Sequence, residues 1–348
     1  MATETITASV DTASSLFLSL PSPNTGGPFA LEVDFKADTN PTKVNLIIGA
    51  YRDDSAKPWS LRVVTAAKRT LDVTYQQHEY PPLRGDDEFL QGARRLVFGN
   101  KLTVSGTGAN SLIAKFMDPT WVNHADIWAD HAAGIRWREI ANLCQRKKLF
   151  VIFDLAYQGF TTGDLDEDAW AVRHFFSDTP LEFAVCQSFS KNLGLYSERV
   201  GALHFAVSRT GASTAASVEA RLVDHHRANV SVAPTFGCRV AVEIFKSPEL
   251  QALWASDLAE MSGRIRQMRR ELHDELVRLE TPGSWGHIVE QVGMFSYTGL
   301  SLTQVHRLRE EFSVYMMPSG RASMCGLTSG NVAYTAWAIC SVVTTTSK

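Results

Sequence analysis

Short apolar runs alternate with helical patterns in the middle of this chain, and this alternation limits the possible folds most. The runs at residues 148–153, 182–186 and 200–206 are rich in apolar side chains, and the first follows a helical pattern at 137–145. Strands that are apolar throughout are buried on both faces, as in a mainly parallel sheet covered by helices. The pattern therefore predicts an α/β fold, in which ligands bind beyond the carboxyl ends of the strands.

The C-terminal part has a different pattern, which predicts a second, smaller domain. Helical periodicity runs over residues 234–279 with a break at Ser247 and Pro248, and Arg and Glu recur along it at i, i+4 spacing. We expect this helical stretch to bridge two domains. The remainder predicts a small α+β domain, with strands at 293–297 and 314–316 and helices at 301–311 and 330–343.

The N-terminal part predicts an arm followed by the first regular elements. Residues 20–45 contain four prolines and the adjacent pair Gly26 and Gly27, so we expect extended chain rather than a packed helix or strand. Arms of this kind often reach across a partner subunit. A strand is expected at 43–48 and a helix at 61–76.

Composition narrows the class of protein. The chain has 34 basic and 37 acidic residues, a net charge of -3 and no strongly basic stretch, which argues against nucleic acid as a partner. Its 5 cysteines are scattered without paired ligand spacing, which predicts reduced thiols and no metal site. No Lys or Arg precedes Lys36, unlike a mitochondrial transit peptide, and the apolar stretch at 14–20 is too short to cross a bilayer. We therefore expect a cytoplasmic protein without a membrane partner.

Residues 188–199 place a lysine between a hydroxyl and an arginine in a loop that contains a glycine. Lys191 follows Ser188, and Gly194 and Arg199 come after it. A lysine in a sheltered, cationic pocket has a depressed pKa and can form a Schiff base with an aldehyde cofactor. Ser188 and Arg199 would then hold a phosphate, the arginine as a bidentate fork. The alternative interpretation is an ordinary solvated surface.

Two other segments have the residue types that such a cofactor requires. Asp154 ends the apolar run at 148–153 and would place an anion beside a pyridine nitrogen, while Tyr157 would hydrogen-bond a ring oxygen. Residues 105–108 (Ser-Gly-Thr-Gly) precede a helical run at 109–116 and offer an anion site at its N-terminus. An aspartate in this position is otherwise a common turn or helix cap.

Aromatic and basic side chains complete the set of candidates. Trp121 and His124 would stack on an aromatic cofactor, or else belong to the core. Arg227 and Arg321 would each hold one carboxylate of a dicarboxylic substrate if the fold brings them together.

Eight stretches of this chain, in order, resemble the aspartate aminotransferases, which are class I, fold-type-I enzymes that depend on pyridoxal phosphate. The longest is the Lys191 segment, Ser-Phe-Ser-Lys-Asn-Leu-Gly-Leu-Tyr-Ser-Glu-Arg-Val-Gly at 188–201. The others lie at 43–52, 78–80, 105–109, 119–124, 153–160, 293–300 and 318–321. The resemblance implies a homodimer with three regions per chain: an arm and part of the small domain at 1–48, a large cofactor-binding domain at 49–257, and a small domain at 258–348.

The resemblance also implies a role for each candidate residue. Lys191 would be the Schiff-base lysine and general base, Asp154 the partner of the pyridinium, and Tyr157 the donor to the ring oxygen. The phosphate ligands would be Ser105, Gly106, Thr107, Ser188 and Arg199, joined by Tyr80 of the neighbouring subunit, with Trp121 and His124 around the ring. The substrate contacts would be Gly49, Trp121, Arg321 on the α-carboxylate, and Arg227 from across the interface on the side-chain carboxylate. The implied reaction exchanges an amino group between aspartate and 2-oxoglutarate, giving oxaloacetate and glutamate.

The chain departs from this family in the large domain. The His-Asn-Pro-Thr-Gly motif is absent, and only 32 residues separate Trp121 from Asp154, which predicts a shortened sheet. Three alternatives follow: an active aminotransferase for aspartate, a catalytically impaired pseudoenzyme or truncated isoform that serves only as a dimerising or interaction protein, or a related enzyme with aromatic substrates.

Overall fold

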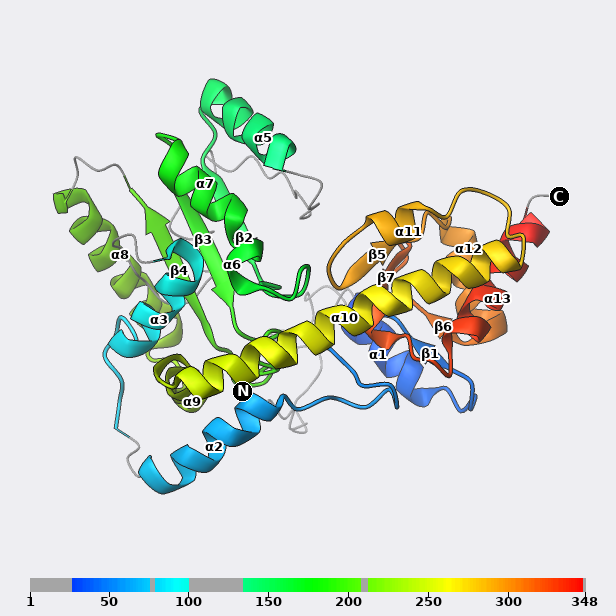
Figure 1. The fold of residues 1–348 in the computed structure, drawn as a ribbon, viewed down its shortest axis with the longest axis horizontal. Coiled ribbons are helices and arrows are strands. Elements are labelled where there is room, and N and C mark those ends of the chain that lie inside the picture. Colours follow the sequence, from blue (N-terminus) through cyan, green and yellow to red (C-terminus); the bar gives the residue numbers. More distant parts are fainter. Residues whose placement is uncertain (1–26, 76–78, 100–133, 208–211, 347–348) are drawn as a thin grey trace, which may run out of the picture.

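A computed structural model describes residues 27–75, 79–99, 134–207 and 212–346. They form a larger part around one sheet and a smaller part around short strands, joined by the long helix α10 (Figure 1). The elements of the larger part are α2 (Arg62–Thr74), α3 (Asp87–Phe98), α5 (Gly134–Lys147), β2 (Val151–Leu155), α6 (Leu165–Asp168), α7 (Trp170–Asp178), β3 (Phe183–Ser188), β4 (Gly201–Ala206), α8 (Ala212–Val230) and α9 (Phe236–Lys246). Those of the smaller part are α1 (Pro28–Ala37), β1 (Val44–Asn45), α11 (His287–Glu290), β5 (Phe295–Tyr297), α12 (Leu302–Phe312), β6 (Val314–Tyr315), β7 (Arg321–Ser323), a 3-10 turn η3 (Met324–Gly326) and α13 (Val332–Thr346).

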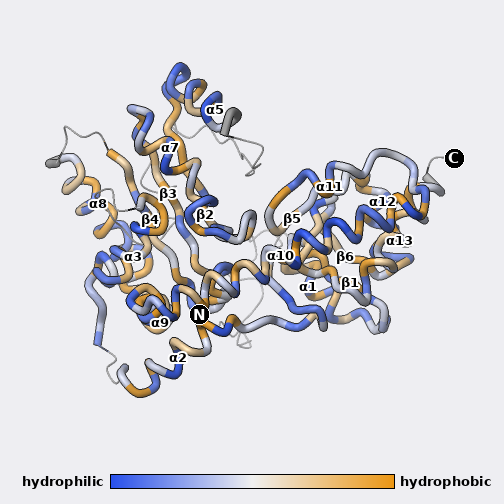
Figure 2. Tube along the Cα trace, viewed as in Figure 1, coloured by the Kyte–Doolittle hydropathy of each residue, from blue (hydrophilic) through white to orange (hydrophobic). Residues whose placement is uncertain are grey.

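Among the described residues, the strands of the larger part's sheet are in the order β2-β3-β4, and helices cover both faces of the sheet. On one face, Phe183 and Val185 of β3 pack against Val172 and Phe175 of α7, and residues of α3 and α5 belong to the same cluster. The other face packs Ala184, Cys186, Leu203 and Phe205 against Leu222 of α8. Figure 2 shows these strands as mainly hydrophobic, so the predicted α/β architecture is confirmed.

Strand direction differs from the prediction at one point. β2 and β3 are parallel, with Asp154 opposite Cys186, whereas β4 runs antiparallel to β3. A parallel return needs a crossover, usually a helix, but residues 189–200 form the lysine loop instead. The prediction of parallel strands was therefore wrong for β4.

The expected arm is only partly extended. Residues 28–37 form α1, with Pro28 in its first turn, where a proline loses no intrahelical hydrogen bond. The prediction that residues 20–45 lack a helix was therefore wrong for α1. The earlier residues of this stretch lie outside the described part of the chain.

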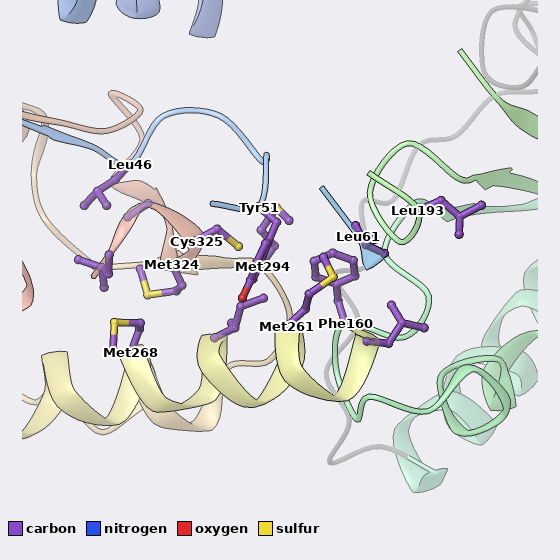
Figure 3. Packing of buried hydrophobic residues seen from close by; sticks show 14 of the residues in the cluster. Leu46, Tyr51, Leu61, Phe160, Leu193, Met261, Met268, Met294, Met324 and Cys325 are labelled. Carbon is purple, nitrogen blue, oxygen red and sulfur yellow. The ribbon is translucent and has the colours of Figure 1, made fainter. Parts of the chain in front are cut away.

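Helix α10 (Pro248–Arg278) begins where the sequence predicted a break. Ser247 accepts a hydrogen bond from the backbone N–H of Leu250 (3.2 Å), and Pro248 occupies the first turn, so α9 ends and α10 starts within two residues. Trp254, Met261 and Met268 lie along one buried side of α10. Figure 3 shows Met261 of α10 beside Phe160 of the larger part and Met268 facing Met324 of the smaller part, and all four belong to one hydrophobic cluster. The division at residue 257 falls inside this helix and remains a prediction.

Candidate active site

The loop that carries Lys191 is fixed at both sides. Asn192 is buried; its side-chain amide donates to the carbonyl of Gln158 (3.3 Å), and its own carbonyl accepts from Trp254 Nε1 of α10 (2.7 Å). Gly194 has a φ of +62°, a conformation that favours glycine. The loop is therefore tied to the turn after β2 and to the connecting helix, which sets the position of Lys191.

The surroundings of Lys191 favour its neutral amine. Burial lowers the pKa of Lys191; the Asp154 carboxylate raises it, and the Arg199 guanidinium lowers it further. The net direction is downward from the ordinary value. The Lys191 ammonium lies 5.0 Å from the centre of the Tyr157 ring. Asp154, Tyr157, Lys191 and Arg199 are therefore brought together, as the sequence predicted.

Tyr157 keeps its proton in this site. Burial raises its pKa to about 12, although the Arg321 guanidinium opposes this shift. A Cβ atom at Gly49 would lie 2.9 Å from the Tyr157 hydroxyl oxygen and 2.6 Å from the end of the Phe295 ring. Gly49 therefore lies directly beside Tyr157, and any larger residue at this position would have to displace one of these rings.

Arg321 is oriented by an aromatic ring. Its guanidinium carbon lies 4.4 Å from the centre of the Phe295 ring, and that ring meets Tyr157 edge-on at 5.9 Å. The Nε of Arg321 is buried and has no hydrogen-bond partner among the described residues. A buried donor of this kind fits a carboxylate that arrives with a ligand.

The ends of the parallel strands meet at the same edge of the sheet. Asp154 is the fourth residue of β2, where its side chain is exposed, and Ser188 ends β3. Ser188 Oγ accepts from the backbone N–H of Ser190 (3.2 Å), and its remaining capacity is available to a ligand. Arg199 has a φ of +56°, a strained conformation for a non-glycine residue, and is exposed near this edge.

Two predicted residues lie elsewhere on the surface. Arg227 is exposed in the last turn of α8 and makes no side-chain hydrogen bond or ion pair within the described ranges. Tyr80 precedes α3 and is 80% exposed. Both are accessible to a second subunit. The remaining candidates, Ser105, Gly106, Thr107, Trp121 and His124, lie outside the described residues.

A buried polar chain supports the site and was not predicted. Gln158 donates to the carbonyls of Leu96 and Leu165 (2.9 Å each) and accepts from Gln187 Nε2 (3.3 Å), and Gln187 Oε1 bonds to His204 Nε2 (3.0 Å). This hydrogen-bond network supports the turn that contains Tyr157, and Phe295 packs against the Tyr157 ring. Their sequence context, ordinary strand and turn positions, has no signal that separates them from core residues.

The arrangement combines a lysine with a depressed pKa, a carboxylate, a protonated tyrosine and an arginine whose Nε has no partner in the described part of the chain. Residues 132–339 match the family model for Aminotransferase class I and II. The chain belongs to this family. The predicted resemblance and the fold-type-I, pyridoxal-phosphate-dependent architecture are thus confirmed.

Individual relatives agree with the family assignment. The chain is 39% identical to an L-tyrosine:2-oxoglutarate aminotransferase of Aspergillus ustus, over 89% of this chain and 75% of that protein. It is 36% identical to the cytoplasmic aspartate aminotransferase of Schizosaccharomyces pombe, over 89% of this chain and 94% of that protein. The cytoplasmic aspartate aminotransferase structure from Saccharomyces cerevisiae superposes with a TM-score of 0.84 at 34% identity, covering 95% of this chain and 99% of the other.

The alignment also bears on the expected shortening. The alignment with the S. pombe aminotransferase spans 386 positions, more than the 348 residues of this chain, so this chain lacks segments that the relative has.

No helix in the described part of the chain is both long enough and apolar enough to cross a membrane. Within the same residues, no group of three or more His, Cys, Asp or Glu side chains is arranged to hold a metal ion.

Proposed function

We propose that this aminotransferase exchanges an amino group between L-aspartate and 2-oxoglutarate, giving oxaloacetate and L-glutamate, with pyridoxal phosphate as its cofactor. The observation that carries the proposal is the amine of Lys191, which is held over Tyr157 with a lowered pKa. The identity with the S. pombe aspartate aminotransferase supports the choice of substrates.

The residues present fit the cofactor. Ser188 and Arg199 offer a hydroxyl and a guanidinium to its phosphate, and Asp154 offers a carboxylate to its ring nitrogen. Tyr157 offers a protonated hydroxyl to the ring oxygen. By family resemblance, Ser105, Gly106 and Thr107 would add to the phosphate site and Trp121 and His124 to the ring, while Tyr80 would reach the phosphate of the neighbouring subunit.

Each side chain then has a defined task. Pyridoxal phosphate, when bound, supplies an aldehyde for amines and a ring that withdraws electrons from the substrate's Cα. Lys191 Nζ would hold the cofactor through its aldehyde, and the free amine would take the proton from the substrate's Cα, a role that a lowered pKa favours. Arg321 holds the α-carboxylate, and Gly49 leaves room for it beside Tyr157.

The substrate's second carboxylate requires a second subunit in this proposal. Arg227 is exposed and lacks a side-chain partner within the described ranges, so it is available to a neighbouring site. We therefore propose a homodimer with shared active sites. The names of the S. pombe and S. cerevisiae relatives support a cytoplasmic location.

Cofactor uptake tests the proposal directly. Purified protein incubated with pyridoxal phosphate should develop a visible absorbance band that shifts when aspartate is added, and oxaloacetate should form with 2-oxoglutarate present. Lys191→Ala should abolish the band. Lys246→Ala removes a lysine that is 52% exposed and pairs with Glu88, so this control should retain it. A folded dimer that takes up no cofactor would instead identify a catalytically silent scaffold.

Aromatic substrates are the second candidate, because the A. ustus relative acts on L-tyrosine and is 39% identical. Rates with aspartate and tyrosine distinguish the two. Arg227→Ala should lower the rate with aspartate more than the rate with tyrosine, because only aspartate has a side-chain carboxylate for Arg227 to bind. Arg221→Ala, another exposed arginine on α8, is the matched control. A preference for tyrosine in the unchanged protein would replace the aspartate proposal.

A further inference from the structure

The segment that contains Gly49 has little free space around it in the candidate site. A Cβ atom at Gly49 would meet Phe295, Tyr157 and Met294 within 3.1 Å, so a small displacement of this backbone changes the space beside Tyr157. The next residue closes a tight turn, since the N–H of Ala50 donates to the carbonyl of Ile48 (2.9 Å). The position of this turn therefore determines how much room a substrate has.

One side chain joins this turn to the lysine loop. The hydroxyl of Tyr196 accepts a hydrogen bond from the backbone N–H of Tyr51 (2.9 Å), although the two residues are 145 positions apart in the sequence. Burial raises the pKa of Tyr196 above its usual range, so the hydroxyl stays neutral at physiological pH. The main-chain carbonyl of Tyr196 accepts from Arg199 Nη1 (3.1 Å). Tyr196 thus links the Arg199 end of the lysine loop with the turn that contains Gly49.

The other side of the turn is held by α10. The guanidinium carbon of Arg264 lies 5.4 Å from the centre of the Tyr51 ring, and its Nη2 donates to the carbonyls of Asp53 (3.2 Å) and Leu327 (2.7 Å). The Tyr51 ring also packs against Trp59 at 5.3 Å. Figure 3 shows the Tyr51 side chain reaching toward α10, with Cys325 beside it. The side chain of Tyr51 is therefore fixed by the smaller part and α10, while its backbone N–H is fixed by Tyr196.

We propose that Tyr196 is a positioning residue whose hydroxyl holds the turn at 48–51 in the substrate-binding position beside Lys191. The inference rests on the proposed function for the identity of the substrate. Without the hydroxyl, the N–H of Tyr51 loses its partner and the turn samples other positions. The apparent affinity for the substrate then falls in proportion to the fraction of molecules that remain competent.

The variant Tyr196→Phe removes only the hydroxyl. We expect the cofactor absorbance band to be unchanged, KM for aspartate to rise about tenfold and kcat to change less than about twofold, as loss of one buried hydrogen bond outside the reacting atoms implies. Hydrogen–deuterium exchange at the Tyr51 amide should accelerate in the cofactor-free protein. Tyr334→Phe is the matched control, because it removes a hydroxyl that donates to the Phe312 carbonyl (2.8 Å) in the smaller part. Neither KM nor exchange at Tyr51 should change in this control.

The outcomes separate the inference from the proposed function. Normal cofactor uptake with an unchanged KM, or unchanged exchange at Tyr51, overturns the role of Tyr196 and leaves the proposed function in place. An unsubstituted protein that never takes up cofactor overturns both. A fall in kcat without a change in KM also overturns the positioning role, because it would assign Tyr196 to the chemical step.

Discussion

Asp257 supports a sharp prediction because it joins two helices from a fully buried position. Its carboxylate accepts from Arg62 Nε (2.6 Å) and from the backbone N–H of Val63 (3.0 Å), and it is 0% exposed. The residue before α2, Leu61, provides no side-chain cap. Asp257 of α10 therefore caps α2 from a distance and pairs with its first side chain.

The expected cost of Asp257→Ala follows from these two bonds. Loss of a helix cap costs about 1 kcal/mol. Loss of a hydrogen bond to a charged group costs about 1.5–3 kcal/mol. Arg62 is 51% exposed, so water solvates its guanidinium in the variant and the larger penalty of a fully buried unpaired charge does not apply. We therefore expect the free energy of unfolding to fall by about 2.5–4 kcal/mol.

Urea unfolding of the cofactor-free protein provides the measurement, with Glu260→Ala as the matched control. Glu260 pairs with the same Arg62 at 3.1 Å from the same helix, but it is 56% exposed, so its loss should cost less than about 1 kcal/mol. The midpoint should shift at an unchanged denaturant slope. An equal loss in the two variants would refute the reasoning that burial and capping, rather than charge, make Asp257 important.

Three further predictions concern single positions. Gly49→Ala should raise KM for the substrate at least about tenfold, because the new Cβ would lie 2.6 Å from Phe295 Cζ; steady-state kinetics tests this, and an unchanged KM would contradict it. Gly326→Ala should lower the free energy of unfolding by about 3 kcal/mol or more in urea, since its Cβ would lie 1.8 Å from the Asn45 carbonyl oxygen, and a variant as stable as the parent would be inconsistent with this packing. Folding lowers the pKa of Lys191, so the unfolded chain binds more protons than the folded chain at pH values between the folded pKa and 10.5. In that window, the free energy of unfolding of the cofactor-free protein should therefore rise with pH relative to that of Lys191→Met. A fall would refute the direction of the pKa shift.

Local patterns in the sequence were sufficient for most of the elements. The apolar runs became β2, β3 and β4, and Ser247 with Pro248 marked the start of α10, because strand burial and helix capping depend on neighbouring residues. The prolines of the arm were misleading, since Pro28 begins a helix as readily as it ends one.

The contacts that assemble the site were beyond such patterns. Tyr196 meets Tyr51 across 145 positions, and Asp257 meets Arg62 across 195. Periodicity reports which face of an element is buried, but it does not specify which distant polar group that face will meet. The direction of β4 was missed for a related reason, since an antiparallel return and a crossover both follow the same apolar run.

The continuity of α10 has a consequence for how this protein comes apart. At 31 residues the helix is about 46 Å long, and its buried side chains belong to a cluster drawn from both parts of the molecule. If either part unfolds, apolar side chains of α10 become exposed to water, although the other part still packs against the same helix. Thermal or chemical unfolding is therefore expected to proceed as one cooperative transition, in which the two parts melt together.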